Sequence, residues 1–148
     1  MNIKELGHAV LYVSSLETVA GFYRDTLGFR ELHREWPLAV FSGGRTHHEL
    51  LLIEVGVASD HPRGRPQTPG LYHLGFNVAD STDELKAVYK ELKEKGVRIL
   101  GTTDHGVTHS LYVLDPDGNE LELYADVSDE WRTNPKAILT PARPLRLD

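Results

Sequence analysis

The chain has 148 residues, of which 40% are hydrophobic and 26% are charged, with a formal net charge of −6. This length and balance predict one compact soluble domain. The net negative charge argues against nucleic acid or an anionic membrane as the main partner. No apolar run approaches the roughly 20 residues of a membrane span, and the N-terminus lacks a signal-peptide layout. With no cysteine, cysteine-based metal sites and nucleophiles are excluded, and we expect a cytoplasmic protein.

The chain repeats itself. Residues 6–29 read LGHAVLYVSSLETVAGFYRDTLGF, and residues 71–97 read LYHLGFNVADSTDELKAVYKELKEKGV. When the two copies are aligned, His8 meets His73 in an L-x-H opening. Each opening continues as HAVLYV or HLGFNV, whose β-branched and aromatic residues are typical of a strand. The repeat therefore predicts two modules of the same architecture.

A helix and three strands follow each opening strand. The expected N-caps and C-terminal stops are Ser14 or Ser15 with Gly28, and Asp80 or Ser81 with Gly96. Strand-like runs follow over residues 29–35, 38–43 and 48–55 in the first copy, and 97–103, 109–115 and 119–125 in the second. We therefore predict an α+β fold in which two tandem βαβββ modules form a curved mixed sheet with the helices outside.

We expect residues 1–148 to form one domain. Module one covers about residues 4–56 and module two about 70–126, joined by a linker rich in proline, glycine and charge. Residues 127–148 contain three prolines and little periodicity, which is more typical of an arm or lid than of a packed element.

The duplicated histidines are candidate metal ligands. If two copies pack around a pseudo-twofold axis, His8 and His73 approach each other, because they occupy equivalent positions. Glu122 shares one strand face with Glu120 and Tyr124, and its carboxylate could complete the set. Two histidines and one carboxylate leave one face of a metal open, an arrangement typical of Fe(II) oxygenases. A single strand histidine is more often a surface residue, but two in register favour a site.

Two segments resemble a known family. FYRDTLGF, residues 22–29, and YVLDPDGNELELY, residues 112–124, are similar to the opening and closing units of the vicinal oxygen chelate superfamily. That superfamily includes glyoxalase I, fosfomycin-resistance enzymes, bleomycin-binding proteins and type I extradiol dioxygenases. The resemblance spans about Lys4 to Trp131 and implies that His8, His73 and Glu122 bind the metal.

Within the superfamily, residues 104–131 resemble the extradiol catechol dioxygenases most. In that family a histidine and a tyrosine before the ligand glutamate contact the substrate oxygens, which implies these roles for His105 and Tyr112. The segment THHELLLIE resembles the family's His-His segment and implies an acid–base role for His48. The resemblance thus implies Fe(II), with Mn(II) or another divalent metal as alternatives, an aromatic diol and O₂ as substrates, and a homo-oligomer. His109 is an added candidate in the same stretch.

Two alternative functions stay open. A glyoxalase I-like lyase or isomerase would use a glutamate from both modules, and a bleomycin-type binding protein would need no metal. HHELLLIE can be aligned with NELELYAD in two ways. One places His48 opposite Glu120 and Leu50 opposite Glu122, and the other is shifted by one residue and brings Glu49 toward the metal. We favour the first, which agrees with the dioxygenase resemblance.

Overall fold

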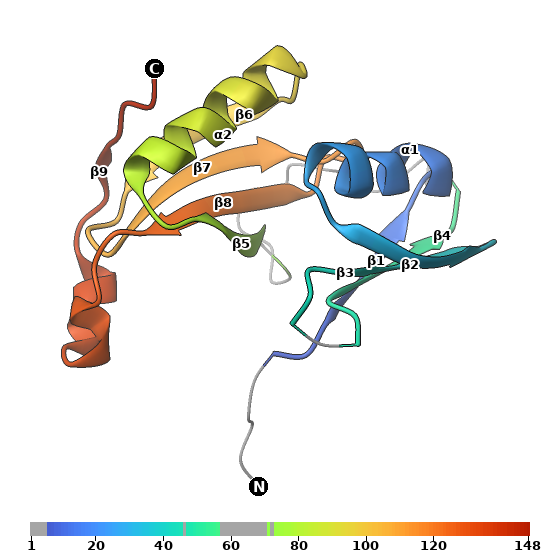
Figure 1. Ribbon diagram of the computed structural model, residues 1–148, viewed down its shortest axis with the longest axis horizontal. Helices are drawn as coiled ribbons and strands as arrows, with labels where there is room; N and C mark the ends of the chain where they lie inside the picture. The colour runs from blue at the N-terminus through green and yellow to red at the C-terminus, as the bar shows by residue number, and fades with distance from the viewer. Residues whose placement is uncertain (1–5, 46, 57–70, 72) are drawn as a thin grey trace, which may run out of the picture. The chain divides into compact units, whose positions relative to one another are not determined.

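A computed structural model describes residues 6–45, 47–56, 71 and 73–148 (Figure 1). The chain divides into two compact units, Met1–Pro66 and Gln67–Asp148. The division falls within the predicted linker, most of which lies outside the described residues.

The first unit is a four-stranded mixed sheet with a short helix. Its elements are β1 (Ala9–Val13), α1 (Leu16–Gly21), a π-helical turn (Phe22–Thr26), β2 (Arg30–Glu35), β3 (Leu38–Ser42) and β4 (Leu50–Glu54). The strand order is β1-β4-β3-β2. Among these strands only the β1–β4 pair is parallel. A parallel pair needs a crossover connection, and α1 is part of the connection from β1 to the antiparallel strands β2, β3 and β4.

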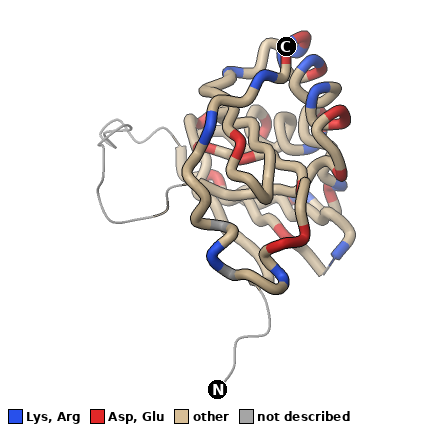
Figure 2. Tube along the Cα trace, turned by 90° about the vertical axis from the view of Figure 1, so that its left-hand side faces the viewer, with Lys and Arg blue, Asp and Glu red and all other residues tan. Residues whose placement is uncertain are grey.

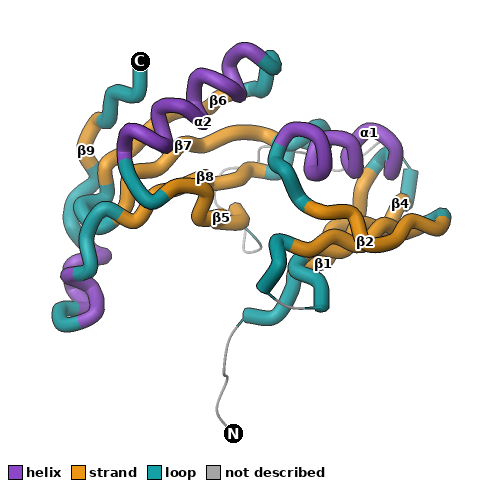
Figure 3. Tube along the Cα trace, in the orientation of Figure 1, coloured by secondary structure: helices purple, strands orange, loops and turns teal. Residues whose placement is uncertain are grey.

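The second unit repeats this plan and adds one strand. Its main elements are β5 (His73–Ala79), α2 (Thr82–Glu94), β6 (Ile99–Asp104), β7 (Thr108–Leu114), β8 (Glu120–Asp126) and β9 (Arg143–Pro144). The order is β5-β8-β7-β6-β9, and β5 pairs with β8 in parallel. The predicted α+β class and the two βαβββ modules are confirmed, and each module builds its own mixed sheet (Figure 3).

Local sequence explains where the helices begin and end. Ser15 caps α1 by accepting the N–H of Thr18, and Ser81 caps α2 by accepting the N–H of Glu84. The second of the two candidates is thus the cap in each module. Gly28 and Gly96 have φ values of 77° and 71°, a region in which glycine carries no Cβ penalty, so both end their helical segments as predicted.

In the second unit α2 covers one face of the sheet. The side of β7 that faces α2 is identified by His109, whose Nδ1 lies 2.8 Å from the Thr82 hydroxyl at the start of the helix. By alternation, the same face carries the fully buried side chains of Leu111, Val113, Leu121 and Leu123. Burial of each leucine side chain stabilises the fold by about 1.5–3 kcal/mol relative to an exposed leucine. The residues between them lie on the opposite face.

The C-terminal segment packs on this sheet, contrary to the predicted arm or lid. β9 pairs with β6, and the hydroxyl of Thr102 donates to the carbonyl oxygen of Leu145 at 2.7 Å. Leu147 is 5% exposed. Strand pairing to β6 needs only backbone groups, so the segment's irregular side-chain pattern did not reveal it.

The surface carries mixed charge. Basic and acidic residues are interspersed along the described chain (Figure 2). Among the described residues, no helix has both the length and the apolarity to cross a membrane.

Candidate functional site

Polar side chains collect on the face of the second sheet that lies opposite α2. The parallel register of β5 and β8 sets His73 against Glu120, Gly75 against Glu122 and Asn77 against Tyr124. β7 adds Ser110 and Tyr112 to this face, because they alternate with the α2-facing residues. Polar side chains thus share one side of three adjacent strands, β5, β8 and β7.

The Glu122 carboxylate is held at both oxygens. Oε1 accepts the hydroxyl of Ser110 at 2.6 Å and the hydroxyl of Tyr112 at 3.2 Å. Oε2 lies 3.1 Å from Nε2 of His73. The carboxylate is therefore oriented from one side by hydroxyls and presents its other oxygen to a histidine.

Tyr112 connects Glu122 to a second histidine. Its hydroxyl lies 2.8 Å from Nε2 of His105, the first residue after β6. A phenol has one proton, so when Tyr112 donates it to Glu122, His105 must donate from Nε2 to the phenol oxygen. His105, Tyr112, Glu122 and His73 form one continuous polar chain.

Burial and neighbouring charges also affect Tyr124. The pKa of its phenol is raised above the ordinary 10.0 by burial, and further by the negative charges of Asp126 and Glu122. Tyr124 is therefore a neutral phenol on this face.

His73 and Glu122 fit a metal site. Two ligand atoms in adjacent positions on one ion, each at about 2.1 Å, lie about 3 Å apart, and the observed Nε2 to Oε2 separation is 3.1 Å. The donor set of imidazole and carboxylate suits Fe, Mn or Zn. The hydroxyls on Oε1 are the kind of outer partner that orients a ligating carboxylate.

The first unit contributes three clustered histidines. The ring centroid of His48 lies 4.5 Å from that of His8 and 4.5 Å from that of His47. The pKa of His48 is lowered below 6.5, first because desolvation disfavours the protonated ring, and then because of repulsion from His47 and His8. His48 thus lies beside His8, which is one of the predicted metal ligands.

A glycine-containing loop supports the segment that carries His8. Arg45 in this loop donates from Nη2 to the carbonyl oxygens of Leu6 and Gly7, at 2.9 and 3.0 Å. The Glu49 carboxylate accepts the N–H groups of Gly43 and Arg45, at 2.7 and 2.9 Å. The backbone before β1 is thus tied to the loop before β4.

The strand register corrects the alignment of the two modules that we favoured. Ala9 pairs with Leu50, whereas Leu74, the equivalent of Ala9, pairs with Leu121. Leu51 therefore corresponds to Glu122, and Glu49 to Glu120, one residue away from the alignment that we favoured. His48 precedes β4, so the strand alternation does not set the direction of its side chain, and its ring still lies beside that of His8.

The predicted site residues belong to different units. His73, His105, Tyr112 and Glu122 lie in the second unit, where the contacts above bring them together. His8 and His48 lie side by side in the first. Over the described residues of either unit taken alone, no three His, Asp or Glu side chains form a group that could hold a metal. The set of His8, His73 and Glu122 stays a prediction.

Sequence reasoning missed three supporting residues, which are Ser110, Gly75 and Arg45. Ser110 could have been found, because it lies two residues before Tyr112 and so shares its strand face. Gly75 and Arg45 depend on pairing across the chain, and no local pattern marks them. His109 lies on the α2 face, near Thr82, and is not part of the polar chain.

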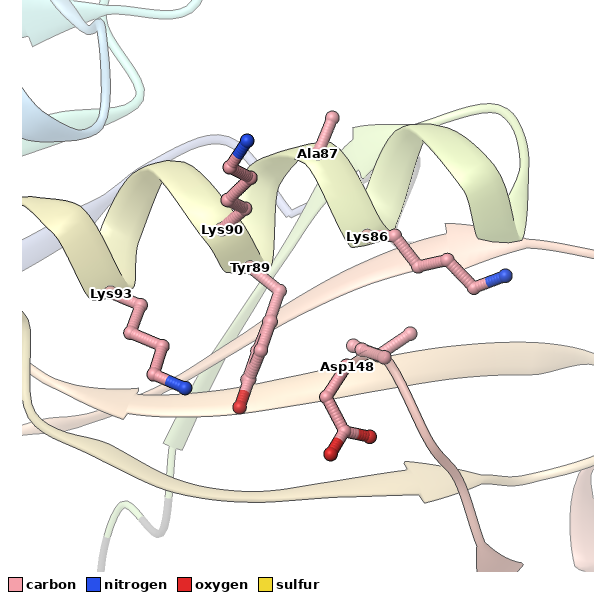
Figure 4. A pocket seen from close by; sticks show the side chains of 7 residues that line it. Lys86, Ala87, Tyr89, Lys90, Lys93 and Asp148 are labelled. Carbon is pink, nitrogen blue, oxygen red and sulfur yellow. The ribbon is translucent and has the colours of Figure 1, made fainter.

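One groove lies elsewhere on the second unit. It measures about 410 Å³ and runs between α2 and the C-terminal residues (Figure 4). Its lining consists of Lys86, Ala87, Tyr89, Lys90, Lys93, Leu147 and Asp148. It contains no histidine and borders the helix on the other face of the sheet from Glu122, so we assign the site to the polar chain instead.

Comparison with known proteins identifies relatives. Biphenyl-2,3-diol 1,2-dioxygenase 3 of Rhodococcus globerulus is 32% identical over 121 residues, which cover 82% of this chain and 63% of the relative. Catechol-2,3-dioxygenase of Bacillus subtilis (strain 168) is 36% identical over 121 residues, covering 82% of this chain and 41% of the relative. The matched region thus spans less than two thirds of either dioxygenase.

Other matches are not named as dioxygenases. Glutathione transferase FosA of Serratia marcescens is 28% identical over 126 residues, covering 82% of this chain and 81% of the relative. The crystal structure of a virulence protein from Salmonella typhimurium matches with a TM-score of 0.62 at 26% identity, covering 86% of this chain and 100% of that one.

Finally, the family model of the Glyoxalase/Bleomycin resistance protein/Dioxygenase superfamily matches residues 5–123. This protein therefore belongs to that superfamily, the vicinal oxygen chelate group.

Proposed function

We propose that the protein is an Fe(II)-dependent extradiol dioxygenase, which cleaves a catechol-type aromatic diol beside its two hydroxyl groups with O₂. The observation that carries the proposal is the continuous polar chain of His105, Tyr112, Glu122 and His73 on one sheet face. It combines a metal-binding pair with two groups suited to diol oxygens. The two dioxygenase relatives, at 32% and 36% identity, support the same branch.

In this proposal His8, His73 and Glu122 hold the metal, one ligand from the first unit and two from the second. Bound there, Fe(II) would supply open positions for the diol oxygens and for O₂. Mn(II) or another divalent metal would suit the same ligands. Ser110 and Tyr112 fix the rotamer of Glu122 through Oε1, so the orientation of this carboxylate does not have to be acquired when the metal binds.

Tyr112 and His105 act on the diol. A diol hydroxyl gives its proton to the Tyr112 oxygen while the Tyr112 proton passes to Nε2 of His105, 2.8 Å away. The Tyr112 hydroxyl, which now carries the proton of the diol, then donates a hydrogen bond to the deprotonated diol oxygen. A histidine suits this task, because its ordinary pKa lies near neutral pH. The pair thereby helps to bind the diol in its deprotonated form.

His48 handles protons on the oxygen side of the reaction. Its ring lies against that of His8, with 4.5 Å between the centroids, so it borders the proposed metal position from the first unit. We assign it the general acid–base role, in which it would take up a proton and then pass it on at the oxygen side of the reaction.

The geometry of Glu49 favours this function over a glyoxalase-type isomerase. By the strand register Leu51 corresponds to Glu122, so the first module has no carboxylate at the position of the proposed ligand. The Glu49 carboxylate instead accepts two backbone N–H groups of the β3–β4 loop, and releasing it would leave both donors without that acceptor. A metal-free binding protein would have no use for the His73–Glu122 pair.

The test is oxygen uptake by protein loaded with Fe(II) under anaerobic conditions and then given catechol and air. We expect about one O₂ consumed per catechol and a yellow ring-fission product, with both lost in His73→Ala and Glu122→Gln. If simple catechols cause no uptake and methylglyoxal with glutathione is turned over, the isomerase function replaces this one. A homo-oligomeric state and a cytoplasmic location also stay predictions.

A further inference from the structure

We propose that Ser110 is a positioning residue, which anchors Glu122 so that the Tyr112 hydroxyl can leave the carboxylate and bind a substrate oxygen. The inference rests on the proposed function, because that function assigns Glu122 to the metal and Tyr112 to the diol. Oε1 of Glu122 accepts hydrogen bonds from two hydroxyls, that of Ser110 at 2.6 Å and that of Tyr112 at 3.2 Å.

The two hydrogen bonds differ in strength. A hydroxyl-to-carboxylate distance of 2.5–2.7 Å is typical of a strong, charge-assisted bond, and the Ser110 contact at 2.6 Å falls in this range. The Tyr112 contact at 3.2 Å exceeds the usual range for O–H···O bonds. Ser110 is also fully buried, with 0% exposure, so water does not compete for its hydroxyl. Ser110 therefore holds the carboxylate more firmly than Tyr112 does.

The Tyr112 hydroxyl, unlike that of Ser110, can change the acceptor to which it donates. Its hydroxyl contacts His105 Nε2 at 2.8 Å as well as Glu122, and its single proton serves one acceptor at a time. When a diol oxygen arrives, Tyr112 can donate to it and keep the contact with His105. Glu122 then retains the bond from Ser110, and its Oε2 stays directed at His73.

Without the Ser110 hydroxyl, these roles would compete. Glu122 Oε1 would depend on Tyr112 alone, so the carboxylate would be held less firmly for the metal. Any Tyr112 that stayed on Glu122 would also be withheld from the diol. Ser110→Ala should thus weaken metal binding first and diol binding second.

The test measures the affinity of the whole chain for Mn²⁺ alone, from the EPR signal of the free ion. We expect the Kd of Ser110→Ala to rise about 10-fold, the lower end of the effect of losing an outer partner of a ligand. Tyr112→Phe should stay within about threefold of wild type, because the Ser110 bond is unaffected. The double variant should lose more than the product of the two single effects, because Tyr112 partly replaces Ser110 in Ser110→Ala.

Thr102→Val is the matched control. It removes a β6 hydroxyl that donates to Leu145 in the same unit, on the α2 face and away from Glu122, and should leave the Kd within about twofold. Ser110→Thr keeps the hydroxyl and should restore affinity. If Ser110→Ala does not fold, Ser110→Cys, which has similar size and a weak donor, makes the same comparison.

The outcomes separate the two proposals. If Glu122→Gln abolishes Mn²⁺ binding but Ser110→Ala binds like wild type or like Thr102→Val, the positioning role is wrong and the metal site stands. If wild type does not bind Mn²⁺, or Glu122→Gln binds as well as wild type, the proposed function fails and this inference with it. In active protein, Ser110→Ala should also raise the KM for catechol more than it lowers kcat.

Discussion

Tyr112 lies directly opposite Glu122 across β7 and β8, with its hydroxyl 3.2 Å from Glu122 Oε1. The turn between the two strands sets this pairing. Within it, the buried Asp115 carboxylate accepts the backbone N–H groups of Asp117 and Asn119 and the side-chain amide of Asn119. The acidic turn motif therefore aligns two site residues that lie ten positions apart.

Replacing Asp115 should weaken this turn. Asp115→Ala leaves the donors of Asp117 and Asn119 without their acceptor, at a cost of about 1–3 kcal/mol in the free energy of unfolding. Urea unfolding measures the loss, with exposed Asp129→Ala as the control. A change no larger than that of the control would show that the turn does not depend on this carboxylate.

Gly75 should keep the Glu122 carboxylate accessible. A Cβ added at Gly75 would lie 3.8 Å from Glu122 Oε2 and 3.6 Å from the Tyr124 ring, both ordinary contacts. Gly75→Ala should therefore bind Mn²⁺ within about twofold of wild type. Gly75→Leu should bind it at least about 10-fold more weakly, because the larger side chain would cover Oε2. Equal Kd values for the two variants would contradict this role.

Arg45 should support His8 through the backbone. Arg45→Met removes the hydrogen bonds to the Leu6 and Gly7 carbonyls, so the segment before β1 becomes less ordered. We expect the Mn²⁺ Kd to rise roughly fivefold, equivalent to about 1 kcal/mol. Lys90→Met, on the exposed side of α2, removes the same charge as a control. If the two variants bind Mn²⁺ equally well, Arg45 does not position His8.

His48 and His47 should differ in catalysis. If His48 is the general acid–base group, His48→Ala should lower kcat about 10²-fold or more. Mn²⁺ affinity should change little, because His48 is not a ligand in the proposed set. His47→Ala, the adjacent control, should reduce kcat far less. A His48→Ala variant with wild-type kcat would remove this residue from the mechanism.

Glu31 should make the stability of the first unit depend on pH. Its pKa is held below the ordinary 4.5, mainly by a hydrogen bond from Arg34 and then by Arg24. A lowered pKa means that the carboxylate stabilises the fold above pH 4.5 and loses this contribution as pH falls through the lowered value. Partial exposure limits the effect to about 1 kcal/mol.

The comparison of wild type with Glu31→Gln tests this. The difference in their free energies of unfolding should be largest near neutral pH and should shrink toward zero at acidic pH. Glu94→Gln, whose carboxylate lies 4.0 Å from Lys90 on the exposed side of α2, should show little difference at any pH. A Glu31→Gln difference that is constant with pH would contradict the assignment.

The sequence by itself determined the repeated βαβββ plan, because strand alternation, serine caps and glycine stops act over a few residues. It also placed Glu120, Glu122 and Tyr124 on one face of a strand, since that needs only a period of two. It also selected His8 and His73, because each histidine occupies the same position in one of the two L-x-H openings.

Only the tertiary structure decided which residues meet across strands. Alternation gives the face of a side chain but not its partner, and a shift of one residue in pairing changes every neighbour. The β1–β4 register therefore overturned our alignment of His48 with Glu120. The same long-range backbone pairing brought Ser110 to Glu122 and set Gly75 opposite that carboxylate. It also gave the C-terminal segment a strand, because hydrogen bonds to β6 need no side-chain pattern.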